Sequence, residues 1–164
     1  MESYDVLLAI SEVGIGMAGF GGIVAGLGYR AQTGWSEQDR IRLIYMATTS
    51  LLVVFSCLFP YIFGHMGVNR PLMASAWSLL PFVLINVISQ IWIYRAGIPE
   101  GYNPLASVLL SLAQLTNLLA VVLLLAGRPI GSPFATYLMC VTLLLFQASI
   151  LFVRLLSTSF REAR

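Results

Sequence analysis

The sequence has little charge and contains no lysine. Only 10% of its 164 residues are charged and 59% are hydrophobic, whereas a typical soluble domain carries about 25% charged residues. This composition excludes a water-soluble fold and predicts a protein of the lipid bilayer. All nine basic residues are arginines, so the side chains that decide membrane orientation belong to one residue type.

Histidine and cysteine are also scarce, which argues against several kinds of site. His65 is the only histidine, and Cys57 and Cys140 both fall within apolar segments. These residues support neither a zinc site, a bis-histidine haem nor a disulfide framework. The chain also lacks a phosphate loop with a lysine, a visible nucleophile and base pair, and a broad basic face for nucleic acid. We therefore expect no catalytic residue, no metal, no cofactor and no nucleic-acid partner.

Uncharged runs of membrane-spanning length dominate the chain. Four of them cover residues 43–64, 71–94, 101–127 and 129–153, and a fifth, residues 6–29, is interrupted only by Glu12. About 20 apolar residues cross a bilayer as a helix. Glu2 and Asp5 stand where a signal peptide would carry basic residues, so the first run is expected to be a retained span. The sequence predicts an all-α integral membrane protein with one domain over residues 1–164, a five-helix bundle with helices at about 4–29, 38–64, 70–94, 104–126 and 133–156.

The arginines predict the orientation of the bundle. Basic residues near span ends are preferentially retained in the cytoplasm. With the N-terminus outside and the C-terminus in the cytoplasm, the outside carries only Arg70 and Arg128. The cytoplasmic side then carries the other seven arginines, Arg30, Arg40, Arg42, Arg95, Arg154, Arg161 and Arg164. We expect a multi-pass protein of the bacterial cytoplasmic membrane, with the lipid bilayer as its first partner.

Aromatic residues gather near the predicted span ends, as interfacial belts require. They are Tyr29, Trp35, Trp92, Tyr94, Tyr102 and Tyr137.

The first predicted helix is unusually rich in glycine. It holds seven of the fourteen glycines, and Gly14, Ala18, Gly22 and Gly26 follow one another at four-residue spacing. Such a small-residue ridge lets helix backbones approach closely. It is interpreted as a subunit contact, as the lining of a narrow pore or as tight packing within one chain. Because Gly16 and Gly19 make the other side of the helix small as well, we expect this helix to lie between other helices.

Glu12 is the one acidic residue expected inside the hydrocarbon. An ionisable group there costs about 2.5–3.5 kcal/mol on insertion scales and is a functional-site hypothesis by default. Helical periodicity places Glu12 on one face with Asp5, Gly16 and Gly19, a smooth stripe that water or an ion could follow. The alternative is a neutral carboxyl group hydrogen-bonded to a neighbouring helix.

Amides and hydroxyls form a second candidate site. Two polar stripes with helical spacing occur on the third and fourth predicted helices, and they reach similar depth because the helices are antiparallel. They are interpreted either as a polar path leading toward Glu12 or as ordinary interhelical hydrogen bonds. The candidate path residues are Glu12, Asn86, Gln90, Ser107, Ser111, Gln114, Asn117 and Gln147.

These features favour a homo-oligomeric channel or pore-like protein for a small ion or solute, with Glu12 as its ionisable element. A small five-helix subunit can hardly enclose a wide aqueous path alone, and symmetric self-association is the usual solution. Two alternatives remain. One is a non-catalytic accessory or scaffold protein whose Gly-rich helix docks on a membrane-protein partner. The other is a protein that binds a lipid or hydrophobic metabolite between its helices.

Overall fold

The computed structural model describes residues 2–30, 37–95 and 104–162 of the chain. These ranges contain five helices and no strand. Every helix includes a stretch of at least 21 residues that is long and apolar enough to cross a membrane. The all-helical prediction with five such helices is confirmed. The helices are α1 (Glu2–Arg30), α2 (Glu37–His65), α3 (Pro71–Arg95), α4 (Pro104–Leu125) and α5 (Pro133–Glu162).

Proline and glycine mark several helix ends. Pro71, Pro104 and Pro133 begin α3, α4 and α5, in the first turn, where the N–H that proline lacks has no intrahelical acceptor. Gly67 and Gly127 follow the ends of α2 and α4 with φ of 76° and 71°, a left-handed conformation that glycine adopts without a steric penalty. Helix α5 continues to Glu162, beyond the predicted end near Leu156, because an apolar run measures the span and not the whole helix. The candidate span within α5 does end at Leu156.

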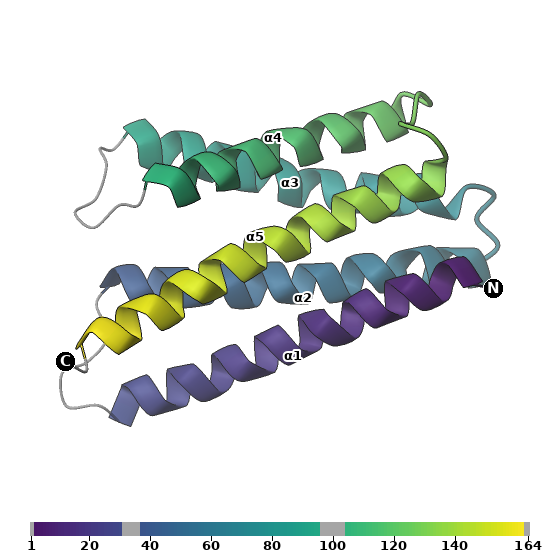
Figure 1. Cartoon of the computed structure of the whole chain (residues 1–164). Helices are drawn as coiled ribbons and strands as arrows, with labels where there is room; N and C mark the ends of the chain where they lie inside the picture. Colours follow the sequence, from purple (N-terminus) through teal and green to yellow (C-terminus); the bar gives the residue numbers. More distant parts are fainter. Residues whose placement is uncertain (1, 31–36, 96–103, 163–164) are drawn as a thin grey trace.

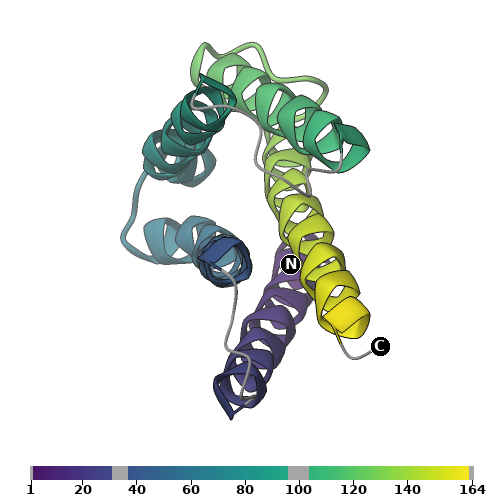
Figure 2. The same cartoon turned by 90° about the vertical axis from the view of Figure 1, so that its left-hand side faces the viewer.

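Four helices form a ring, and α1 lies outside it. The helices α2, α3, α4 and α5 each contact the next, and α5 closes the ring against α2 (Figure 1, Figure 2). Within the described ranges, the backbones of α2 and α4 do not approach each other across the ring, and the backbone of α1 approaches only those of α2 and α5. Figure 2 shows α1 on the side of the bundle away from α3 and α4. Within one chain, therefore, α1 does not lie between other helices as the sequence predicted.

The apolar core fills the end of the ring where α1 begins. One cluster joins α1, α2, α3, α4 and α5 through side chains such as Leu7, Val53, Leu79, Leu124 and Leu144. A smaller cluster of Val83, Ala120, Val121 and Cys140 lies between α3, α4 and α5. The bundle is thus held by packing around α5, the helix that contacts all four others.

Tyr137 belongs to this core and not to an aromatic belt. Its side chain is fully buried, because the hydroxyl finds a main-chain acceptor inside the bundle. The interfacial prediction is therefore wrong for Tyr137. The other five aromatic side chains expected in the belts lie outside the described residues and side chains.

Candidate functional site

The outer face of α1 carries Glu12. With about 100° of rotation per residue, Glu12 points away from the side of α1 that packs on the bundle. That packed side includes the buried residues Leu7, Gly14 and Gly21. The exposed side, called here the Glu12 face, comprises Asp5, Glu12, Gly16 and Gly19, all four of which are exposed.

Glu12 has no polar partner in the described part of the chain. The structure gives it neither a hydrogen bond nor an ion pair there. The candidate span of α1 runs from Tyr4 to Val24, which places Glu12 about 12 Å from one end and about 18 Å from the other at 1.5 Å per residue. In a bilayer, both distances are too long for a glutamate side chain to reach the headgroups. The internal hydrogen bond proposed as an alternative is not present among the described residues.

The glycines beside Glu12 leave an open surface. A Cβ atom built on Gly16 or Gly19 would have no atom of the chain within 4 Å apart from its local helix backbone. The surface of α1 is therefore open around Gly16 and Gly19, and another backbone can approach it closely there. Ile23, which is 60% exposed, lies further along the same side.

The predicted small-residue ridge divides between two surfaces. A Cβ on Gly14 would lie 3.1 Å from the carbonyl oxygen of Ser50 and 3.1 Å from a methyl group of Val54. Ala18 is half-buried, whereas Gly22 and Gly26 are exposed with nothing within 4 Å of an added Cβ. A step of four residues turns about 40° more than one full helical turn. The ridge therefore winds from the α2-facing side of α1 toward the Glu12 face.

The second set of candidates is turned into the ring. Ser107, Gln114, Asn117 and Gln147 are buried, while Asn86, Gln90 and Ser111 are half-buried. Two of these side chains bond to their own helix. Asn86 donates to the carbonyl oxygen of Phe82 (3.0 Å), and Ser111 donates to that of Ser107 (2.8 Å). Such local bonds satisfy the side chain without joining helices.

Three buried side chains in this region lack hydrogen-bond partners. They are the amide of Asn117, through both its nitrogen and its oxygen, the Nε2 atom of Gln147 and the hydroxyl of Ser50. Asn117 is 1% exposed, so its amide is removed from water without direct replacement. Buried amides normally bond to protein or to ordered water. Ser50 was not among the candidate site residues, although it follows Thr48 and Thr49 in a polar stretch of α2.

The structure does not bring Glu12 together with the inner polar residues. Glu12 lies on the outside of α1, and α1 contacts only α2 and α5 in the described ranges. Asn117 lies on α4, on its buried side. A single chain thus presents two separate polar features, one inside the ring and one on its outer surface.

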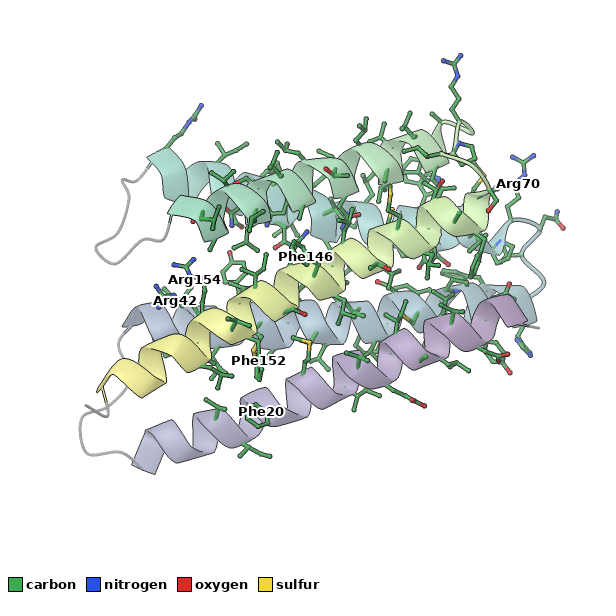
Figure 3. The ribbon with its side chains drawn as sticks, in the orientation of Figure 1. Phe20, Arg42, Arg70, Phe146, Phe152 and Arg154 are labelled. Carbon is green, nitrogen blue, oxygen red and sulfur yellow. The ribbon has the colours of Figure 1, made fainter. Side chains whose placement is uncertain are left out.

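The two ends of the bundle differ in their described arginines. Arg42 and Arg154 lie at one end and Arg70 at the other (Figure 3). Toward the first end, the rings of Phe20 on α1 and Phe152 on α5 pack edge to face, with their centroids 5.2 Å apart (Figure 3). The side chains of Arg30, Arg161 and Arg164 lie outside the described part.

Within the described residues, no group of three or more His, Cys, Asp and Glu side chains is placed to hold a metal ion. No family model, curated protein or solved structure matches the chain.

Proposed function

We propose that the protein is a homo-oligomeric membrane channel for a small ion or solute, with the Glu12 face of α1 lining a narrow path between subunits. One observation carries this proposal. The carboxyl group of Glu12 is exposed near the middle of an apolar span, on a side of α1 that none of the other described helices covers.

The free-energy cost of a carboxyl group in hydrocarbon favours contact of Glu12 with water or protein over contact with lipid. Leaving an ionisable side chain in the hydrocarbon costs about 2.5–3.5 kcal/mol, and this penalty falls if the group meets water or protein. Gly16 and Gly19 next to Glu12 leave room for close approach. Symmetric association of identical subunits would repeat the same face around an axis. A ring of α1 helices would then place one Glu12 per subunit beside a shared path.

The proposal includes the orientation. The N-terminus lies outside and the C-terminus in the cytoplasm of a bacterial inner membrane. The supporting feature is the charge distribution, since the described arginines Arg40, Arg42, Arg95 and Arg154 are at the end where α5 finishes, and only Arg70 and Arg128 are at the other.

The accessory-protein alternative uses the same surface. A larger membrane protein that docks on the Glu12 face with a hydrogen-bond donor would also remove Glu12 from lipid. It predicts no flux from the purified protein alone, so reconstitution separates the two functions.

Cysteine accessibility in liposomes tests the location of the path. Gly16→Cys places a thiol on the Glu12 face, and Leu112→Cys places one on the exposed side of α4, where Leu112 is 57% exposed. Cys57 and Cys140 are buried, so the parent protein is the blank. A charged, water-soluble thiol reagent should block ion flux through Gly16→Cys and leave Leu112→Cys and the parent unchanged. Flux that is equally insensitive in all three proteins would contradict a path along α1.

A further inference from the structure

A pocket opens at the end of the bundle where α1 begins. Its volume is about 380 Å³, within the range of roughly 300–1,000 Å³ that is usual for small-molecule sites. Three segments that are distant in sequence build it. They are the start of α1 at Tyr4, the start of α3 from Arg70 to Met73, and the turn between α4 and α5 around Pro129.

The walls of this pocket are mostly apolar. Leu72, Met73, Leu124 and three prolines line it, and Arg70 is the only charged residue among the described residues of the lining. The Arg70 side chain is exposed, and its Nη1 atom contacts the sulfur of Met73 at 3.7 Å. Thioether sulfur is a weak acceptor, and the described residues give Arg70 no carboxylate partner. Most of the five N–H donors of the Arg70 guanidinium are therefore available to a bound anion.

The beginning of α3 adds to the positive potential at the same wall. The first turn of α3 holds no acidic residue. The N–H groups of Leu72 and Met73, at the positive end of the helix dipole, therefore have no carboxylate within that turn to complement them. The neighbouring start of α5 differs, because the hydroxyl of Ser132 accepts a hydrogen bond from the N–H of Ala135 at 3.1 Å. The positive charge of Arg70 and the positive end of the α3 dipole thus lie beside an apolar pocket.

We propose that this pocket binds an anionic phospholipid, with the phosphate at Arg70 and one acyl chain against Leu72, Met73 and Leu124. Arg70 lies between the candidate spans Arg40–His65 and Pro71–Ile91, which places it at the level of lipid headgroups in a bilayer. A zwitterionic lipid carries a cationic group that the same potential disfavours. Tyr4 also lines the pocket, and its phenolic hydroxyl is a further donor for headgroup oxygens. This site is independent of the proposed conduction along α1.

Native mass spectrometry of the purified full-length protein tests the proposal. The probes are phosphatidylglycerol, phosphatidylcholine of the same chain length, and inorganic phosphate. The variants are Arg70→Gln, Met73→Trp and the control Arg128→Gln, which removes an exposed arginine at the same end that does not line the pocket. The thermal stability of each variant in detergent establishes that it is folded.

The wild type should retain phosphatidylglycerol over phosphatidylcholine, and Arg70→Gln should reduce that preference about 5-fold, as for one arginine near a lipid surface. Arg128→Gln should keep the preference, and Met73→Trp should lower the retention of both lipids by filling the hollow. Equal losses in Arg70→Gln and Arg128→Gln, or no preference in the wild type, would overturn the proposal. Displacement of the lipid by inorganic phosphate at equal concentration would also overturn it, because the acyl chain would then contribute nothing.

Discussion

The hydroxyl group of Tyr137 on α5 donates a hydrogen bond of 2.6 Å to the main-chain carbonyl oxygen of Ser56 on α2. In a regular helix that carbonyl would accept from the residue four positions later, which here is Pro60, inside α2. Proline has no N–H. Tyr137 thus supplies the donor that Pro60 removes, and an unsatisfied carbonyl in the apolar core is avoided.

Replacement of Tyr137 by phenylalanine should destabilise the bundle by about 0.6–1.7 kcal/mol, between the average and the largest value for side-chain hydrogen bonds in membrane bundles. The loss should shrink in a Pro60→Ala background, because alanine restores the intrahelical donor. Unfolding in mixed micelles for the wild type, the two single variants and the double variant measures this coupling. An equal effect of Tyr137→Phe in both backgrounds would contradict the relationship.

The glycines of α1 should respond differently to alanine. At Gly14 the new methyl group would lie 3.1 Å from the Ser50 carbonyl oxygen, whereas at Gly22 no side chain or neighbouring helix of the described residues lies within 4 Å of it. Both substitutions gain helix propensity, so Gly22→Ala is a matched control. Gly14→Ala should be less stable than Gly22→Ala by about 1–3 kcal/mol, the usual range for overpacking. Thermal unfolding of the two variants at equal detergent concentration decides, and equal stabilities would show that α1 and α2 do not pack as described.

Asn117 provides a test of the inner polar region. Asn117→Leu removes a buried amide whose nitrogen and oxygen lack partners, and it should raise stability by about 1–3 kcal/mol. Asn86→Leu is the control, since it removes an amide that donates a 3.0 Å hydrogen bond to the carbonyl oxygen of Phe82. Its stability should not rise above that of the wild type. We expect Asn117→Leu to keep its ion flux in liposomes. A folded, stable Asn117→Leu protein without flux would move the path from α1 to the inside of each subunit.

Helical periodicity was sufficient to place Asp5, Glu12, Gly16 and Gly19 on one face of α1. It did not show whether that face is covered, because glycines occupy both sides of the helix and offer no apolar stripe to mark the packed one. Packing decides this through residues such as Leu7 and Met17, which meet the rest of the bundle. Uncharged runs likewise predicted the five helices. They could not predict that α5 contacts all other helices, because that position depends on contacts such as Tyr137 to Ser56, 81 residues apart.

The orientation follows from charge and can be tested independently of function. A reporter fused after Arg164 should be active in the cytoplasm only, and one inserted between Gly67 and Asn69 should be active outside only, because seven of nine arginines would otherwise face outward. Thiol labelling of a cysteine at Val68, with and without membrane permeabilisation, is the matching chemical assay. Labelling of that position from the cytoplasm would contradict the proposed topology.

If Glu12 lies beside a conduction path, its substitution should change ion flux in liposomes across a pH series. The comparison is wild type, Glu12→Gln and the control Asp39→Asn, which changes a carboxyl residue at the start of α2 and outside the Glu12 face. Glu12→Gln is nearly isosteric and should stay folded. It should alter ion selectivity or remove the pH dependence of flux, whereas Asp39→Asn should retain both. Identical flux profiles for wild type and folded Glu12→Gln would contradict the role assigned to Glu12, and flux no greater than in empty liposomes for all three proteins would contradict the channel itself.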